Sequence, residues 1–450
     1  MTGYVYIAIA VSTLGGLIFG YDIGVSGGAG GFVASDLELD SLLTGAVVSA
    51  STFGGMFGAL AGGPLADRFG RRWTLLLAGM LFSVGAAVSA FAPDLGVLLA
   101  GRVVVGIGVG AASVLVPVYI AELAPSRVRG ALVAGFQLLT TLGILVGYGI
   151  NAMLVDTEAW RTSLGLAAIP GVLLALGVLL IPESPRWLIV QGRRDDALRV
   201  LRRIRGRHDV AQEVDDIEAV NREDETAHRG RWRDLFRGWV RPMVVVGILV
   251  AFFANGCGIN LIVYFAPQIL QSVGMGSSAS LLATVGLGVV NVLFTVVGML
   301  LVDRIGRRPM LLIGAVGMTI SLGALAVLLA FPVNESTATL SMIFLALYIV
   351  VYAVSPGLVA YVVISEVFPL HVRAKATAAA TFVIFATNLL IGMFSLPLLE
   401  SLGATGTLSI FAAVCVAFIV FCFRMPETKG KSLEELEEHF RTAGMTEARR

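Results

Sequence analysis

The sequence is short of charged residues. Of its 450 residues only 14% are Asp, Glu, Lys or Arg, whereas a typical soluble domain has about a quarter. Residues 1–66 contain no Lys or Arg at all. The formal net charge of +1 argues against nucleic-acid binding, which needs a basic surface. The composition is typical of a protein embedded in a lipid bilayer.

Histidine and cysteine are scarce as well. All four His residues lie outside the apolar runs: His208, His228, His371 and His439. The three Cys residues lie in apolar runs, with neither metal-ligand spacing nor a disulfide framework: Cys257, Cys415 and Cys422. No nucleophile–base arrangement stands out. We therefore expect no metal site, no cofactor and no enzymatic activity.

Apolar residues and glycine are abundant instead. The hydrophobic share is 57% and glycine occurs 53 times, and small residues let transmembrane helices approach closely. A helical span needs roughly 20 apolar residues. Twelve spans are predicted, at about 4–25, 41–63, 73–92, 96–120, 131–153, 160–181, 240–271, 279–302, 309–331, 339–364, 374–399 and 404–424. The expected fold is all-α integral membrane, without a cleavable signal peptide.

Basic residues predict the orientation of these spans. Nearly all Lys and Arg residues follow the even-numbered spans or lie in the polar insert 182–239, whereas acidic residues dominate the opposite loops. Cytoplasmic loops carry an excess of Lys and Arg. Both termini are therefore expected in the cytoplasm of a multi-pass plasma-membrane protein. The exceptions are Arg161, at the start of the sixth span, and Arg102, inside the fourth.

The insert and the C-terminal tail are expected to form cytoplasmic helices. In the stretch 195–204 the apolar residues share one helix face: Ala197, Val200, Leu201 and Ile204. The stretch 231–239 offers side chains to the membrane interface: Trp232, Leu235, Phe236 and Trp239. In the tail, Ser432 and Glu435 form a capping box for a further helix.

The chain contains an internal duplication. "LADRFGRRWTLLL" (65–77) returns as "LVDRIGRRPMLLI" (301–313), and "YIAELAPSRVRGALVA" (119–134) returns as "VVISEVFPLHVRAKATAA" (362–379). "IPESPRW" (181–187) is echoed by "MPETKGKS" (425–432). Each block follows the corresponding helix of its half.

The duplication predicts two pseudo-symmetric six-helix bundles. They would comprise residues 1–181 and 240–424, with a cytoplasmic helical linker at 182–239 and a cytoplasmic tail helix within 425–450. In such a pair of parallel repeats, a ligand binds between the halves near the membrane midplane.

The repeated blocks place acids and bases together at the predicted cytoplasmic ends of the helices. In the first half these residues are Asp67, Arg71, Arg72, Glu122 and Arg129, and in the second half they are Asp303, Arg307, Arg308, Glu366 and Arg373. Ion pairs among them would form a gating network that locks the halves together when the cytoplasmic side is closed. The alternative is that the bases only orient the helices.

The combination of motifs resembles the sugar porter family of the major facilitator superfamily. The resemblance covers nearly all of the chain and rests on D-R-x-G-R-R in both halves, "YIAELAP" after the fourth span, "PESPRWL" after the sixth, "GIN" and "YFAP" in the seventh, and "PETKGKSLEELE" after the twelfth. It implies the major facilitator fold. It also implies transport of a monosaccharide or polyol across the lipid bilayer by alternating access, in a functional monomer.

The resemblance further implies a set of substrate-binding residues in this chain: Phe19, Gln137, Asn260, Tyr264, Asn291 and Asn388. The residue types agree with this role. A buried polar side chain in an apolar helix costs free energy unless it finds a partner, and amides both donate to and accept from hydroxyl groups. Hydrogen bonding between helices is the alternative.

The chain departs from the family pattern at two places. Ala254 and Asn255 stand where many members have two Gln residues, and Tyr361 stands where many have a Trp. Asn255 and Tyr361 are substrate-binding candidates, and hexoses, pentoses and inositols all remain open. Pro356 and Gly357 interrupt the backbone hydrogen bonds of the tenth helix, which suits a gating hinge.

Asp22 is an acidic residue near the end of the first apolar run, and Arg102 is a basic residue inside the fourth span. Asp22 would lie about four residues before the outer end of its helix and Arg102 about five or six after the start of its own, so both would be roughly 6–9 Å deep. An ion pair is therefore expected. The glycine-rich stretch 24–31 is expected to form a flexible outer end.

The resemblance implies that this acid–base pair marks proton-coupled members. Burial favours the neutral form of a carboxylic acid and an adjacent Arg favours the ionised form, so separation of the pair would let Asp22 bind a proton. The leading prediction is proton-coupled import of a monosaccharide or polyol. The alternatives are a facilitative uniporter, in which the ion pair is static, and a non-transporting sugar sensor.

Overall fold

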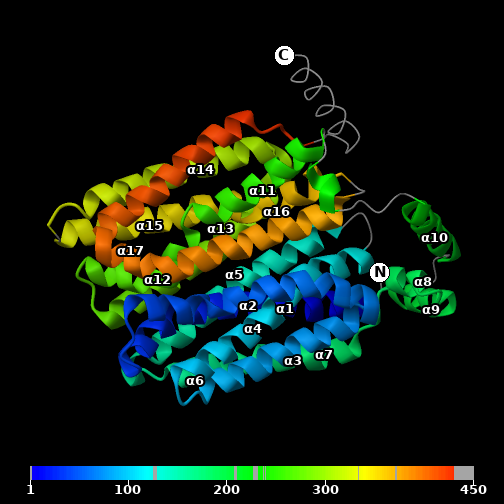
Figure 1. Cartoon of the computed structure of the whole chain (residues 1–450), viewed down its shortest axis with the longest axis horizontal. Helices are drawn as coiled ribbons and strands as arrows, with labels where there is room; N and C mark the ends of the chain where they lie inside the picture. The colour runs from blue at the N-terminus through cyan, green and yellow to red at the C-terminus, as the bar shows by residue number, and fades with distance from the viewer. Residues whose placement is uncertain are drawn as a thin grey trace. The chain divides into compact units, whose positions relative to one another are not determined.

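The structure is a computed structural model that describes residues 3–124, 129–206, 210–226, 232–236, 238, 240–332, 334–369 and 372–429. Every regular element in these ranges is a helix (Figure 1). The first half contains α1 Gly3–Asp36, α2 Ser41–Phe69, α3 Arg71–Ala90, α4 Leu95–Leu123, α5 Arg129–Met153, η1 Val155–Thr157, α6 Trp160–Leu166 and α7 Ala168–Leu180. The insert contains α8 Pro185–Val190, α9 Arg194–Arg205, α10 Ala211–Thr226 and η2 Trp232–Phe236. The second half contains α11 Val240–Gly256, α12 Ile259–Ser272, α13 Ser277–Ile305, α14 Arg307–Leu328, α15 Glu335–Val354, α16 Pro356–Val367 and α17 Arg373–Arg424.

The membrane spans correspond to the predicted ones. Within the described ranges, 11 helical segments are long and apolar enough to cross a membrane. One of them, Lys375–Arg424, has 50 residues, which is far more than the roughly 20 that a bilayer needs. It contains two predicted spans, 374–399 and 404–424. Gly403, with a φ of 69°, interrupts α17 between them.

The first helix is longer than predicted, and its glycine-rich stretch is not a flexible end. α1 continues to Asp36, so Asp22 lies in its interior, and the expected position about four residues before the helix end was wrong. The glycines allow close packing: a Cβ at Gly20 would lie 1.8 Å from the carbonyl oxygen of Thr140, and one at Gly28 would lie 2.3 Å from Nδ2 of Asn151. Because α1 is packed this tightly, the stretch stays helical.

Three predicted spans are each divided between two helices. The expected helix 160–181 is divided at Ala167 into α6 and α7. The expected helix 240–271 is divided at Gly258, whose φ of 93° ends α11 and starts α12. The expected helix 339–364 is divided at Ser355, and α16 begins with Pro356. The break at Pro356 and Gly357 was predicted and is confirmed. The break at Gly258 was not predicted.

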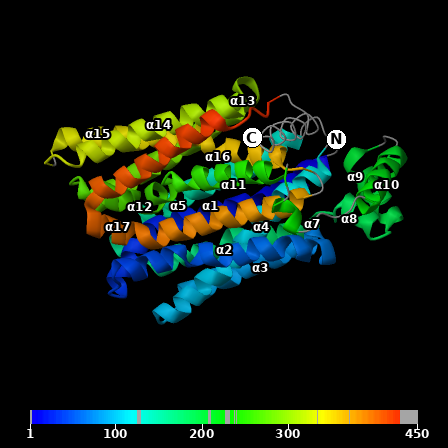
Figure 2. The ribbon, with the colours of Figure 1, turned by 45° about the horizontal axis from the view of Figure 1, so that its top comes forward.

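The chain forms two compact units. The first comprises Met1–Asp22, Ala50–Ile144 and Arg161–Arg229, and the second comprises Ile23–Ser49, Leu145–Trp160 and Gly230–Arg450. The division therefore crosses α1, α2, α5 and the first residue of α6, and it differs from the two sequence halves. In the first unit α3 lies beside α4 and α7 (Figure 1). In the second unit α14 lies beside α15 and α17 (Figure 2).

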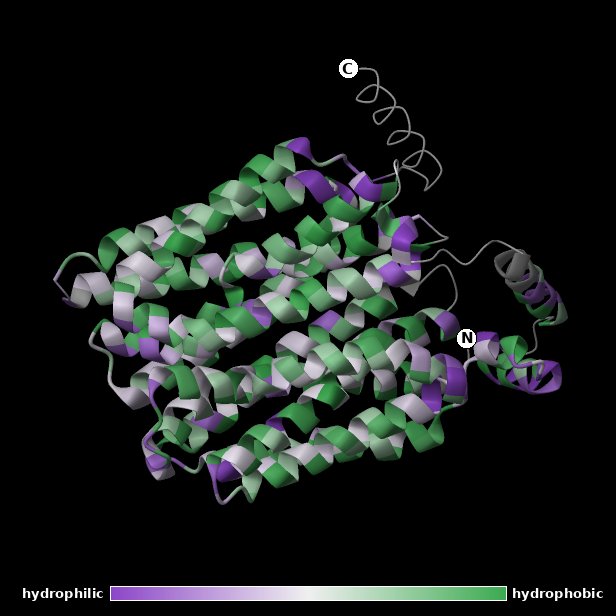
Figure 3. Ribbon diagram, in the orientation of Figure 1, coloured by the Kyte–Doolittle hydropathy of each residue, from purple (hydrophilic) through white to green (hydrophobic). Residues whose placement is uncertain are grey.

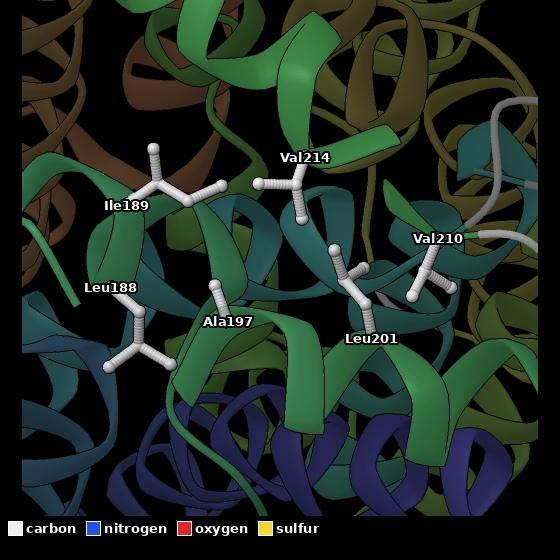
Figure 4. Packing of buried hydrophobic residues seen from close by; sticks show 6 residues of the cluster. All are labelled: Leu188, Ile189, Ala197, Leu201, Val210 and Val214. Atoms are coloured by element: carbon white, nitrogen blue, oxygen red, sulfur yellow. The ribbon is translucent and has the colours of Figure 1, made fainter. Parts of the chain in front are cut away.

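The insert has a small apolar core of its own. Figure 4 shows its buried side chains, which come from α8, α9, α10 and the residue directly before α10: Leu188, Ile189, Ala197, Leu201, Val210 and Val214. The predicted helix 195–204 is confirmed as α9. The apolar residues Ala197, Leu201 and Ile204 are buried, and much of the rest of the helix is hydrophilic (Figure 3). In η2, Trp232 and Phe236 are exposed and Leu235 is buried. Trp239, Ser432 and Glu435 lie outside the described residues.

The helices α3 and α14 start in the same way in the two halves. Each follows a single glycine with positive φ, 96° at Gly70 and 106° at Gly306. The first N–H groups of a helix have no partner within it. In α3 the N–H groups of Arg71 and Arg72 donate to the carboxylate of Glu183, and in α14 those of Arg307 and Arg308 donate to Glu427. The Pro-Glu blocks thus cap these helices.

The two capping carboxylates differ in acidity. Burial raises the pKa of Glu183, and the N–H groups of Ser184, Arg72 and Arg71 only partly offset this effect. Burial raises the pKa of Glu427 too, but bonds from the N–H groups of Lys429, Arg307, Arg308 and Thr428 outweigh it, so its pKa lies below the usual value.

The opposite shifts predict opposite pH dependences of stability. The contribution of Glu427 is complete above its unfolded-state pKa of about 4.3 and is lost as the pH falls through the lower folded-state pKa. That of Glu183 is complete below about pH 4.3 and is lost as the pH rises through the raised pKa. At pH ~7.5, Glu427→Gln should therefore lower the melting temperature more than Glu183→Gln does.

Thermal unfolding of the purified protein, followed by intrinsic fluorescence at several pH values, tests this expectation. The gap between the two variants should narrow as the pH falls toward about 4. Equal losses at every pH would show that the two caps do not differ in acidity.

Candidate functional site

Asp22 of α1 and Arg102 of α4 form a buried ion pair in the first unit. Oδ1 of Asp22 lies 2.6 Å from Nη1 of Arg102, and the two side chains are 7% and 3% exposed. Nη2 of Arg102 also donates to Oγ of Ser51 on α2, at 3.3 Å. The predicted contact is confirmed, and it joins three helices. Removing one partner of a buried pair leaves an uncompensated charge and costs about 3–5 kcal/mol.

Two asparagines of the second unit have buried polar atoms without a protein partner. Asn260 on α12 is 6% exposed and Asn388 on α17 is 7% exposed. Nδ2 of Asn260, a donor, and Oδ1 of Asn388, an acceptor, make no hydrogen bond. An unpaired buried polar group costs about 1–3 kcal/mol. A hydroxyl group both donates and accepts, so a polyhydroxy ligand would supply what both atoms lack.

Tyr264 lies where these two helices pack together. A Cβ at Gly392 of α17 would lie 3.6 Å from Cε2 of Tyr264 on α12. Asn260 and Tyr264 are four residues apart, as are Asn388 and Gly392, and residues at this spacing share a helix face. The structure therefore brings Asn260, Tyr264 and Asn388 to one interface between α12 and α17.

Three other predicted residues lie elsewhere in the second unit. Nδ2 of Asn255 donates to the carbonyl of Ala251, one turn earlier in α11, at 3.1 Å. This local bond engages one of the groups with which Asn255 could bind a ligand. Asn291 is buried on α13, and Tyr361 on α16 is 45% exposed.

Phe19 and Gln137 lie in facing stretches of the first unit. A Cβ at Gly16 would lie 2.4 Å from the carbonyl oxygen of Phe136, and one at Gly20 would meet α5 at Thr140. Residues 16–20 of α1 thus pack against residues 136–140 of α5. Both Phe19 and Gln137 are half-buried there.

The predicted gating residues form ion pairs inside each unit. Arg71 lies 3.3 Å from Asp67 and 3.1 Å from Glu122, measured between guanidinium nitrogens and carboxylate oxygens. In the second unit Nη2 of Arg307 lies 2.8 Å from Oε1 of Glu366. The two halves therefore repeat this pairing as well as their sequence motifs.

The remaining bases of these blocks bind backbone carbonyls. Arg72 donates to the carbonyls of Val178 and Leu179 at the end of α7. Arg308 donates to those of Cys422 and Phe423 at the end of α17, and Nε of Arg373 donates to that of Phe368. The last carbonyls of a helix lack helical donors. The structure does not describe the side chains of Arg129 and Asp303. Their predicted ion pairs therefore stay predictions.

Sequence reasoning missed Ser51 and Thr428. Ser51 binds Arg102, and Oγ1 of Thr428 donates to Glu366 at 2.7 Å. A serine in an apolar helix carries little signal, because its hydroxyl can always bond the preceding turn. Thr428 belongs to the second Pro-Glu block, so its place in the duplication was an available signal.

Comparison with known proteins assigns the chain to a family. The family described as "Sugar (and other) transporter" matches residues 8–440. The putative metabolite transport protein YwtG of Bacillus subtilis is 43% identical over 95% of this chain and 93% of its own length. The D-xylose transporter of Levilactobacillus brevis is 41% identical over 98% of this chain and 96% of its own.

A solved structure extends the match to the fold. The xylose transporter XylE from E. coli, in a partially occluded inward-open conformation, superposes with a TM-score of 0.83 at 30% identity. The match covers 96% of this chain and all of that one. The predicted helical membrane fold is confirmed, and these relatives are transporters rather than enzymes. This agreement runs through both halves and all the repeated blocks, and the chain accordingly belongs to the sugar porter family of the major facilitator superfamily.

Proposed function

We propose that this protein imports a monosaccharide or polyol together with protons, by alternating access. The observation that carries the proposal is the buried ion pair between Asp22 and Arg102. Charged residues inside membrane spans are expensive, and they commonly mark ion pathways and proton relays. One structure of XylE describes that similar protein as a proton:xylose symporter, which supports proton coupling here.

In the proposed cycle Asp22 exchanges one positive partner for another. While the pair is intact, Arg102 balances the carboxylate charge. When the pair separates, a proton from the outer solution binds the carboxylate, so that no unpaired negative charge stays in apolar surroundings. Proton and sugar leave together on the cytoplasmic side, and the ion pair forms again.

The proposed substrate is uncharged, because no charged side chain belongs to the candidate set. Asn260, Tyr264 and Asn388 would bind hydroxyl groups from the second half. Phe19 and Gln137 would contribute from the first half. The other candidates are Asn255, Asn291 and Tyr361.

The proposed topology follows from the basic blocks. Both termini, the linker 182–239 and the tail 425–450 would be cytoplasmic in a plasma-membrane protein that works as a monomer. The bundles 1–181 and 240–424 would move as the two halves, with Pro356 and Gly357 as a hinge. The ion pairs of the repeated blocks would strengthen the closed cytoplasmic side.

Replacing Asp22 by Asn tests the coupling. Asn keeps the size of the side chain but cannot bind and release the transported proton. We expect pH-driven uphill uptake of sugar into liposomes to fall to the equilibrium level, whereas exchange of sugar across the membrane persists.

Asp94→Asn is the matched control, because Asp94 caps α4 and Asn is an equally good N-cap. It should leave uphill uptake intact. If uphill uptake survives in the Asp22→Asn protein, Asp22 is not the coupling residue. If the unsubstituted protein equilibrates sugar without responding to a pH gradient, it is a uniporter with a static ion pair.

Replacing Asn260 or Asn388 by Leu tests the substrate site. Each change removes an unpaired buried polar atom, so the ligand-free protein should melt at a higher temperature. The stabilisation by a bound sugar should shrink, with affinity falling about tenfold through the loss of a hydrogen bond. Thermal shifts with xylose, arabinose, glucose and myo-inositol measure both effects.

The alternative role of these asparagines predicts the reverse. If they tie helices together, their replacement by Leu should lower the melting temperature of the ligand-free protein and leave ligand-induced shifts unchanged. Unchanged ligand-induced shifts in both variants would show that Asn260 and Asn388 do not bind the substrate.

A further inference from the structure

The outer part of α12 contains a backbone carbonyl without its helical donor. Pro267 has no N–H group, so it cannot bond the carbonyl of Val263 four residues earlier. Phe265, between them, has non-helical angles, with φ −122° and ψ 15°. Inside a bilayer such a carbonyl needs another partner.

Tyr148 of α5 supplies that partner. Its Oη donates to the carbonyl oxygen of Val263 at 2.8 Å, and the residue is 5% exposed. The ring is held in place by α13, because a Cβ at Gly288 would lie 3.1 Å from Cδ2 of Tyr148. The bond therefore joins a residue of the first sequence half to the broken helix of the second.

The end of α1 is hydrogen-bonded to the end of α5 and contacts the same carbonyl. Nδ2 of Asn151 on α5 donates to the carbonyls of Gly24 and Val25 on α1, at 3.2 and 3.1 Å. A Cβ at Gly27 of α1 would lie 2.7 Å from the oxygen of Val263. The ends of α1 and α5 thus form one body that meets α12 at Val263.

The other break in this span has a matching arrangement inside the second half. The carbonyl of Cys257, next to Gly258, accepts the Oη of Tyr348 on α15 at 3.0 Å and the Sγ of Cys415 at 3.8 Å. At each of the two interruptions, a tyrosine hydroxyl therefore donates to a backbone carbonyl. Only the bond of Tyr148 crosses from one sequence half to the other.

We propose that Tyr148 is a positioning residue that keeps the outer side of the transporter closed through its hydrogen bond to Val263. This inference rests on the proposed alternating access, in which the ends of α1 and α5 leave α12 whenever the outer side opens. The bond then breaks and water binds the carbonyl of Val263. We call this hydrogen bond between Tyr148 and Val263 the latch. Because Val263 directly precedes Tyr264 in α12, the latch adjoins the candidate substrate site.

The experiment uses a thiol reporter on a different seam of the outer side. Ser49 of α2 is buried, and a Cβ at Gly392 of α17 would lie 3.0 Å from its own Cβ. In Ser49→Cys protein, a membrane-impermeant maleimide should react from outside only while the outer side is open. The native cysteines are all buried, and the protein without the reporter gives their background.

Adding Tyr148→Phe to the reporter protein should speed labelling from outside about fivefold, the factor that one hydrogen bond of average strength makes in a two-state equilibrium. Tyr348→Phe is the matched control, since it removes the same hydroxyl–carbonyl bond within one half. It should leave the rate unchanged. Melting temperatures identify any variant that fails to fold.

The latch proposal would be overturned by an unchanged rate of maleimide labelling in folded Tyr148→Phe protein. An equal increase of that rate in Tyr348→Phe protein would overturn it as well. The readout needs neither sugar nor a pH gradient. A failure of the latch is therefore distinguishable from a failure of the proposed proton coupling, which the Asp22→Asn uptake assay reports. Faster labelling only from the cytoplasmic side would also contradict an outer latch.

Discussion

Backbone N–H and C=O groups inside a bilayer have no water to bond, so each of them must find a partner within the protein. Uninterrupted helices meet this requirement by themselves. At several helix starts and breaks among the described residues, a side chain supplies the missing partner. The hydroxyl of Tyr148 does so at the kink in α12 and that of Tyr348 does so at the break between α11 and α12. The carboxylate of Glu183 does so at the start of α3, and that of Glu427 does so at the start of α14.

Partners are equally scarce for charged side chains inside the bilayer. Asp22 and Arg102 balance one another, and each would be costly alone. The unpaired amide atoms of Asn260 and Asn388 are tolerated in the ligand-free protein, which is understandable if a ligand completes them. A coupled transporter needs both features, because its affinity for a proton and for a sugar must change as its helices move.

The two halves repeat the same contacts, but the pKa values of the repeated carboxylates differ. The pairs Arg71–Glu122 and Arg307–Glu366 match, and so do the two helix caps. The caps nevertheless have pKa values shifted in opposite directions, since burial dominates at Glu183 and hydrogen bonds dominate at Glu427. Repeated sequence thus specifies repeated contacts, while the surrounding burial differs between the halves.

The sequence by itself determined the number and placement of the apolar helices, the break at Pro356, and the acid and base that pair inside the membrane. Length, hydropathy and a missing N–H group are local properties, so they can be read without a fold. The tertiary structure decided that α1 continues through its glycines and that the seventh predicted span is divided into α11 and α12 at Gly258. It also decided that Ser51 bonds Arg102, Thr428 bonds Glu366 and Tyr148 bonds the carbonyl of Val263. Whether a glycine stays in a helix depends on the backbone that packs against it. The hydrogen-bond partner of a hydroxyl group lies in a distant segment that only folding brings near.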